Sequence, residues 1–334
     1  MICPCLALLP KIHDIGAARG GAEHKHGCGS WQVRVLYPFP NVPKSSPKRM
    51  SLASRVASAA AAIRRAEAIY ITAGAGMGVD SGLPDFRGRQ GLWREYPPLQ
   101  ERDLDFDDMA NPNWFEDDVT FAWGFYGHRL NLYRRTVPHE GFHIMRRWAE
   151  ARPRESFVFT SNVDGQFQKA GFGRNVLECH GSLHHLQPLD PRAGSKVVDA
   201  DDFELPEVDP QTLRVPAESV PRDAAGWVLR PNVLMFGDWG WVSSRTDRQQ
   251  RHHDEWLRDL QASGCPAVVI ECGAGLAVPT VRRASESVAQ LLGCPLVRIN
   301  PRDSQVPSHI EASPLELNSL DALQRLDAAL SREQ

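Results

Sequence analysis

The sequence predicts an α/β fold, built on a doubly wound, Rossmann-like parallel sheet. Short apolar runs end at small or polar residues, stretches with helical spacing separate several of them, and a glycine-rich turn follows the first run. Such runs are typical of parallel strands that are buried on both faces. The predicted strands are 68–72, 156–160, 175–179, 232–236, 267–271 and 295–299. Ligands in such folds bind beyond the carboxyl ends of the strands, so we expect the site there.

Composition sets limits on the class of protein. The chain has 334 residues, 42% of them hydrophobic and 24% charged, enough for a substantial core in one large or two ordinary domains. A net charge of −3 does not indicate a partner such as nucleic acid or a membrane surface. Seven scattered cysteines favour the reducing cytoplasm over a disulfide framework. We expect no signal peptide and no membrane span, because the apolar stretch at 1–9 is short and interrupted by prolines.

The expected domain organisation follows the chain in order. Residues 1–49 show no periodicity, and we interpret them as disordered or as a non-native extension, with Met50 as a candidate start. Residues 50–330 are expected to form one catalytic domain. It begins with a helix over 51–66 and closes with a helix over 315–330. Two insertions are expected, an aromatic-rich helical module at about 89–140 and an irregular small-domain segment at 183–226.

The first candidate site is the turn after the first strand, which contains Gly74, Ala75 and Gly76. Glycine-rich turns of this kind let a phosphate approach the backbone N–H groups. The glycine spacing alone is a weak signal, and a tight turn that binds nothing explains it equally well. The following Asp85, Phe86 and Arg87, within a proline-stiffened PDFRG loop, favour a ligand.

Together, the glycine turn and the PDFRG loop resemble the NAD-binding signature of the sirtuins, the NAD-dependent protein deacylases. Further matches extend the resemblance over most of residues 60–300. It implies that the pyrophosphate of NAD lies on the turn at 74–78. It also implies that Asp85 belongs to the cofactor site and that Phe86 and Arg87 close the nicotinamide end.

Two more motifs follow predicted strands. Ser161, Asn162 and Asp164 stand in TSNVDG, which is similar to the sirtuin TQNIDG, whose Asn and Asp line the nicotinamide and ribose pocket. Taken alone, they would be read as residues that cap a turn. His180, in CHG, matches the family's catalytic histidine, which acts as a general base. Taken alone, it would be a strand-end histidine bonded to backbone, and we interpret His184 and His185 as solvated or structural.

The remaining matches concern the adenosine end and the peptide. Gly273, Ala274 and Gly275 resemble the family's GTS turn but lack its two hydroxyls, and Asn300 resembles its adenine-ribose asparagine. Gly78 likewise replaces a usual serine. The segment RPNVLMFGD resembles the edge to which a peptide adds as a strand, which implies substrate contacts at Val233, Phe236 and Gly237.

No CxxC pair lies between 182 and 229, so the sequence predicts a small domain without zinc and no metal ligands. The resemblance implies an NAD-dependent protein-lysine deacylase that transfers the acyl group to ADP-ribose, with an acylated protein or peptide as partner. Two alternatives stay open. The lost hydroxyls and the missing zinc site leave room for a protein ADP-ribosyltransferase or NAD hydrolase, and a non-catalytic NAD or ADP-ribose sensor is the other alternative.

Overall fold

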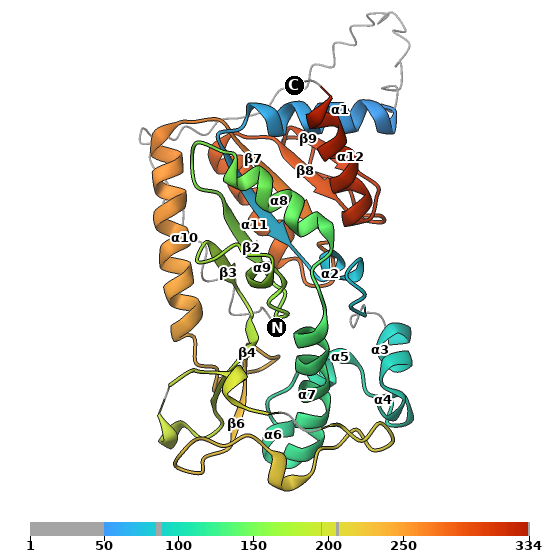
Figure 1. The fold of residues 1–334 in the computed structure, drawn as a ribbon, viewed down its shortest axis with the longest axis vertical. Helices are drawn as coiled ribbons and strands as arrows, with labels where there is room; N and C mark the ends of the chain where they lie inside the picture. The colour runs from blue at the N-terminus through green and yellow to red at the C-terminus, as the bar shows by residue number, and fades with distance from the viewer. Residues whose placement is uncertain (1–49, 85–88, 195, 205–206, 333–334) are drawn as a thin grey trace, which may run out of the picture. The chain divides into compact units, whose positions relative to one another are not determined.

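A six-stranded parallel sheet forms the centre of the fold (Figure 1). Its order is β3-β2-β1-β7-β8-β9, and every pair of neighbours is parallel. Counted along the sheet, this is the doubly wound order 3-2-1-4-5-6, with the topological switch between β1 and β7. The predicted fold class is therefore confirmed. The strands are β1 (Ala68–Ala73), β2 (Phe157–Thr160), β3 (Val176–Glu178), β7 (Ala267–Cys272), β8 (Leu296–Ile299) and β9 (Ala312–Leu315).

The structure is a computed structural model that describes residues 50–84, 89–194, 196–204 and 207–332. Leu52–Gln334 forms one compact unit, to which everything below refers. The predicted disorder of residues 1–49 lies outside the described residues. Among the described helices, none has the length and apolar character needed to cross a membrane.

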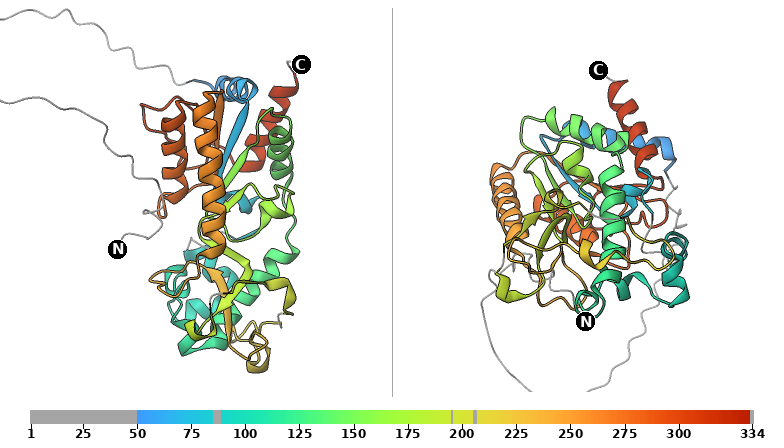
Figure 2. Two further views of the ribbon diagram at one scale, coloured as in Figure 1. Left: turned by 90° about the vertical axis from the view of Figure 1, so that its left-hand side faces the viewer. Right: turned by 60° about the horizontal axis from the view of Figure 1, so that its bottom comes forward.

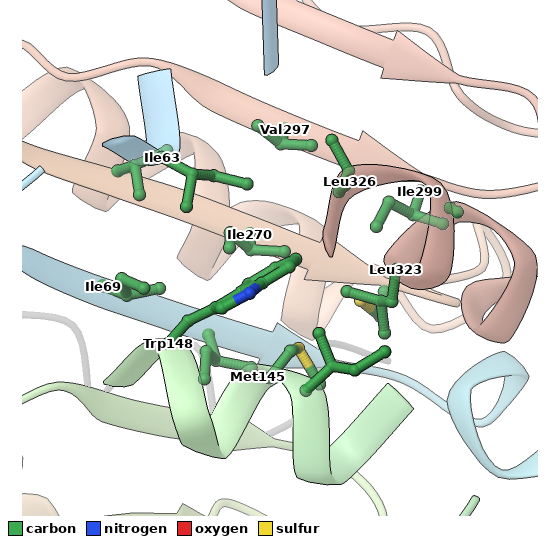
Figure 3. Packing of buried hydrophobic residues seen from close by; sticks show 14 of the residues in the cluster. Ile63, Ile69, Met145, Trp148, Ile270, Val297, Ile299, Leu323 and Leu326 are labelled. Atoms are coloured by element: carbon green, nitrogen blue, oxygen red, sulfur yellow. The ribbon is translucent and has the colours of Figure 1, made fainter. Parts of the chain in front are cut away.

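Helices cover both faces of the sheet. On one face, Ile63, Trp148, Leu323 and Leu326 pack with the strand residue Ile270 in a single hydrophobic cluster (Figure 3). These side chains come from α1 (Leu52–Arg65), α8 (Glu140–Glu150) and α12 (Ser319–Ser331). The other face is covered by α10 (Ser244–Ser263) and α11 (Thr280–Leu292). Burial on both faces explains why the strands read as continuous apolar runs.

A second lobe combines helices with a small antiparallel sheet of order β5-β4-β6. The predicted aromatic module is its core. Phe121, Trp123 and Tyr126 are buried with Leu183 and Leu229 of the small sheet, and the Trp123 indole donates to the Leu229 carbonyl at 3.0 Å. Its elements are α3 (Arg89–Glu95), α4 (Pro97–Glu101), α5 (Phe106–Met109), α6 (Trp114–Asp117), α7 (Val119–Arg135), β4 (Gly181–Pro188), β5 (Val198–Asp199), β6 (Leu229–Val233) and the 3-10 helices at Pro191–Ala193, Ala200–Asp202 and Ala217–Ser219.

Two short helices follow strands of the large sheet, α2 (Gly76–Val79) after β1 and α9 (Gln166–Lys169) after β2. Helix α10 links the two lobes along the chain. Figure 2 shows it (orange) running from the region of the small sheet up to the start of β7.

Several predicted boundaries were wrong. The run 232–236 does not join the parallel sheet: its strand is β6, which ends at Val233 and pairs antiparallel with β4. The chain turns after it because Gly237 adopts φ 70° and Asp238 forms a buried ion pair with Arg230 at 2.8 Å. The segment 183–226 is not irregular throughout, since β4 takes up its first residues. The last helix begins at Ser319, because Leu315 belongs to β9.

Candidate active site

Two glycine turns interlock at the topological switch point, where the strand order reverses between β1 and β7. The Gly74 N–H donates to the Cys272 carbonyl, and the Gly76 N–H donates to the Gly273 carbonyl, both at 3.0 Å. Gly273 has φ 63°, and a Cβ there would lie 2.3 Å from the Met77 nitrogen. A Cβ on Gly74 would lie 2.7 Å from the Gly273 oxygen. Only glycine permits so close an approach of the two backbones, at the point where open α/β sheets bind dinucleotides.

The other residues predicted for the first turn divide into two groups. Ala75 is half-buried and directly precedes α2, so it lies within the interlocked region. Asp85, Phe86 and Arg87 lie outside the described residues, and their predicted contacts stay predictions.

The TSNVDG motif reaches the same place from β2. The Ser161 N–H donates to the Ala73 carbonyl at 3.2 Å, beside the first turn. The Asn162 side-chain amide donates to the Gly74 carbonyl at 3.0 Å. Both residues are buried. The end of β2 is thus attached to the end of β1 and to the glycine turn that follows it.

Asp164 is a buried carboxyl with few partners. It is 7% exposed, and its Oδ1 accepts a hydrogen bond from the Gln166 N–H at 3.0 Å. Burial is the main cause that raises the pKa of Asp164 to about 6; the hydrogen bond from the Gln166 N–H and the charge of Arg129 oppose the shift, and the nearby Glu178 carboxylate adds to it. A carboxyl with a pKa shifted toward neutrality by burial is a recognised mark of a functional site.

His180 lies at the junction of the two lobes. It lies two residues after the end of β3, is half-buried, and its carbonyl accepts a hydrogen bond from the Leu234 N–H at 3.0 Å. The next residue, Gly181, begins β4 with φ 78°, and a Cβ there would lie 2.1 Å from the Asn232 oxygen. His180 therefore stands between the end of the large sheet and the strand β6.

His184 and His185 are both half-buried, which agrees with the structural alternative of the sequence interpretation. The His184 Nε2 donates to the Asp164 carbonyl oxygen at 3.1 Å. Burial lowers the pKa of both imidazoles, that of His185 to about 4 with a further contribution from the nearby Arg245. Both are therefore neutral near pH 7. In the part of the chain that the structure describes, no group of three or more His, Cys, Asp or Glu residues is arranged to hold a metal ion.

The far end of the site is formed by the turns after β7 and β8. The Asn300 amide nitrogen donates to the Ala274 carbonyl at 2.9 Å, and its Oδ1 accepts from the N–H groups of Arg302 and Asp303. Asn300 thus links the turn that follows β8 to the turn at 273–275. Gly275 faces open space, since a Cβ on it would meet no atom within 4 Å.

The predicted substrate residues lie on or just after β6. Val233 is 8% exposed and pairs with Gly181, next to His180. Phe236 is 47% exposed, and its N–H donates to the Ala110 carbonyl at 2.8 Å. Gly237 makes the turn with φ 70°. β6 is the last strand in the order β5-β4-β6, so among the described residues its outer side has no paired strand, although all five of its residues are buried.

Sequence reasoning missed the buried polar residues that support the site. Glu178, two residues before His180, is 1% exposed and forms an ion pair with Arg245 of α10. Its backbone N–H also donates to the Gln249 side chain at 3.1 Å. A glutamate inside a short apolar strand is a signal that could have been used, because a buried carboxylate requires a partner.

Sequence comparisons with known proteins identify relatives of this chain. A sirtuin-5 deacylase of Danio rerio is 29% identical over 247 residues, which cover 68% of this chain and 72% of that protein. The matches to the sirtuin-5 of Canis lupus familiaris (31% identical over 194 residues) and to an NAD-dependent protein deacylase of Aquifex aeolicus (29% over 170) cover 52% and 51% of this chain. The chain spans less than two thirds of these two relatives, 57% and 62% of their lengths.

Solved structures show the same fold. A Sir2 homologue in complex with NAD superimposes with a TM-score of 0.59 at 21% identity, over 83% of this chain and 94% of that one. A second Sir2 structure gives a TM-score of 0.54 at 20% identity, over 84% and 99%. The family model described as the Sir2 family matches residues 74–254, more than half of the chain. The chain belongs to the Sir2 family.

Proposed function

We propose that the chain is an NAD-dependent protein-lysine deacylase, which transfers the acyl group of an acylated lysine to ADP-ribose and releases nicotinamide. One observation carries this proposal. Asn162 and Asp164 lie with the two glycine turns at the switch point of the sheet, and His180 lies just beyond the neighbouring strand end, beside the edge strand β6. The names of the relatives, NAD-dependent protein deacylase and deacetylase, support the same activity.

The residues present fit NAD as the cofactor. A Cβ at Gly74, Gly76 or Gly273 would strike neighbouring backbone, so the turns are kept free of side chains at the place where a dinucleotide would bind. Gly74, Ala75, Gly76 and the 273–275 turn would hold the phosphates. Asn162, Asp164 and Ser161 would lie toward the nicotinamide end, and Asn300 toward the adenosine end. Asp85, Phe86 and Arg87 stay in the proposed cofactor set.

The peptide would bind along β6. An extended chain that pairs with an edge strand is held by backbone hydrogen bonds, which read little of the sequence. Val233 and the exposed Phe236 would contact the acyl-lysine and its flanking residues. His180 would then face both substrates, because its backbone is bonded to Leu234 just beyond the strand.

In this arrangement His180 acts as the general base. Bound NAD supplies the ribose carbon that takes the acyl oxygen as nicotinamide leaves. A neutral His180 imidazole accepts the proton of a ribose hydroxyl, which leaves that oxygen free to take the acyl group. Asn162 holds the first glycine turn in place through the Gly74 carbonyl, and Asp164 contributes a carboxyl in a site largely closed to water.

Nicotinamide release with NAD, measured with and without an acetyl-lysine peptide and with products identified by mass, tests the proposal. Peptide-dependent release with O-acetyl-ADP-ribose formed is the expected result. His180→Ala should abolish it yet retain NAD binding, whereas the exposed His309→Ala should leave it unchanged. Release without peptide would instead indicate an NAD hydrolase or ADP-ribosyltransferase. Binding of NAD without any release would indicate a sensor.

The proposal also includes a cellular location and a small lobe without zinc. Cys265, Cys272 and Cys294 are free, which supports the cytoplasm as the proposed location. We also propose that the small lobe needs no zinc, because the buried aromatic cluster and the Arg230–Asp238 ion pair hold it together. Metal analysis of the purified protein should find less than about one zinc per ten chains. A full equivalent would contradict this part.

A further inference from the structure

Arg282 of α11 is buried beneath the far end of the proposed cofactor site. It is 8% exposed, and its guanidinium donates to the backbone carbonyls of Asp303 at 2.7 Å and Gln305 at 2.9 Å, with a longer contact of 3.4 Å to the Ala274 carbonyl. The site residues predicted from the sequence do not include it.

The Arg282 guanidinium bonds to backbone oxygens, whereas the neighbouring carboxylates bond to another arginine. The neighbouring carboxylates of Glu271 and Glu286 bond to Arg298, at 2.6–2.9 Å, and Arg298 also donates to the Gln305 carbonyl at 2.6 Å. Arg282 is thus left to bond backbone oxygens. Burial of an arginine is costly unless its hydrogen bonds are satisfied. The hydrogen bonds of Arg282 connect two loops, the turn at 273–275 and the turn at 300–305.

The two loops are the ones that bracket the adenosine end. Asn300 adds its own 2.9 Å bond to the Ala274 carbonyl, so that oxygen accepts from two buried side chains and is turned into the protein. In a trans peptide the carbonyl and the following N–H point in opposite directions. The Gly275 N–H is therefore turned outward, and a Cβ on this residue would meet open space. Within the described residues, this N–H donates to no backbone carbonyl outside helices and strands.

We propose that Arg282 is a positioning residue for the cofactor. By tying the 273–275 turn to the turn at 300–305, it holds the Gly275 N–H ready to donate to a phosphate oxygen. This inference rests on the proposed NAD site. It also accounts for the hydroxyl residues replaced by Ala274 and Gly275, because a fixed backbone N–H can bind an anion where a side-chain hydroxyl is missing.

The test is direct binding of ADP-ribose by calorimetry, together with steady-state kinetics, on Arg282→Met, Arg282→Lys and the control Arg283→Met. Arg283 is the exposed neighbour on the same helix, so its variant changes charge alone. We expect Arg282→Met to weaken ADP-ribose binding about tenfold and to raise the KM for NAD similarly. The kcat and the KM for the acyl peptide should stay within about twofold of wild type. Lysine, which keeps a donor, should restore part of the affinity, and Arg283→Met should behave as wild type.

Other outcomes separate the inference from the proposed function. Wild-type affinity in Arg282→Met would overturn the inference alone. Equal losses in kcat, peptide KM and NAD KM, with a lowered melting temperature and no rescue by lysine, would show a purely structural role and overturn it too. If the methionine variant does not fold, the lysine variant decides, and unchanged ADP-ribose binding there rejects the proposal. A wild-type protein that binds neither NAD nor ADP-ribose would overturn the proposed function itself.

Discussion

The Asn162 side-chain amide donates a 3.0 Å hydrogen bond to the backbone carbonyl of Gly74, across 88 positions of sequence. This bond joins the end of β2 to the first glycine turn. It fixes the turn from the same edge of the sheet on which Asp164 lies, so one side chain aligns two parts of the proposed cofactor site.

Asn162→Ala should therefore misplace the first turn. Displacement of a catalytic site by about 1 Å reduces rates about 100-fold, and we expect a loss of kcat/KM for NAD of that order. Asn175→Ala is a matched control, because the Asn175 amide also donates to a backbone carbonyl, that of Ser156 at 3.2 Å, which precedes the start of β2 at the opposite end from the site. Comparable losses in both variants would show that Asn162 has only a general structural role.

Asp164→Asn should stabilise the fold while abolishing the proposed deacylase activity. Burial raises the pKa of Asp164 to about 6, so ionisation of this carboxyl at higher pH destabilises the folded state relative to the unfolded state. Two pKa units correspond to about 3 kcal/mol, and asparagine retains the acceptor for the Gln166 N–H. Urea denaturation at pH 8 should show a gain of about 1–3 kcal/mol in the free energy of unfolding. A loss of stability would mean that Asp164 is ionised and well stabilised in the folded protein.

The buried histidines should make the fold sensitive to acid. Burial lowers the pKa of His139, His184 and His185, the last to about 4. Below about pH 6.5 the unfolded chain gains protons that the folded chain excludes, so their contribution to stability is lost as the pH falls from about 6.5 toward 4. Asp164, with its raised pKa, acts in the opposite direction over about pH 6 to 4.

Denaturation curves at a series of pH values give the free energy of unfolding at each pH, and therefore its slope against pH. His185→Gln should flatten it, and the exposed His309→Gln should leave it unchanged. The slope should steepen in Asp164→Asn, because the opposing group is gone. An unchanged slope in His185→Gln would contradict the assignment.

The two glycines that flank Ala274 should respond differently to substitution. Gly275→Ser meets open space and restores a hydroxyl, so we expect normal stability and NAD binding tightened about two- to threefold. Gly273→Ala places a Cβ 2.3 Å from the Met77 nitrogen at φ 63°, so we expect loss of NAD binding and of stability. Calorimetric titration with NAD and thermal melting distinguish the pair. Equal tolerance of both changes would argue against the interlocked turns.

The sequence allowed the large sheet to be predicted because its strands are buried on both faces. Val268, Val269 and Ile270 form a continuous apolar run, which is typical of such a strand, and all three are buried. The strand β9, with Ser313 and Pro314 among four residues, lacks that signal, and β4 contains two adjacent histidines. These two strands are defined by their pairing partners and not by their own composition.

The same distinction applies to the site. Asn162, His180 and Asn300 were found because the motifs around them resemble those of the sirtuins, and all three lie just after strands of the large sheet. Arg282 and the Glu178–Arg245 pair were not found, because the partners of Arg282 lie 21–23 positions away and the two members of the pair lie 67 positions apart. Local patterns identify residues at strand ends, whereas the buried polar contacts beneath them depend on the finished tertiary structure.

The packing of α1 against α12 determines when the protein can finish folding. Ile63 near the start of the unit shares one buried cluster with Leu323 and Leu326 near its end (Figure 3). A ribosome makes the last of these residues about 260 positions after the first, at roughly 5–20 residues per second. For that whole interval the nascent chain presents an unfinished apolar face to the cell. Until α12 has been made, α1 lacks part of the apolar surface against which it packs in the folded protein.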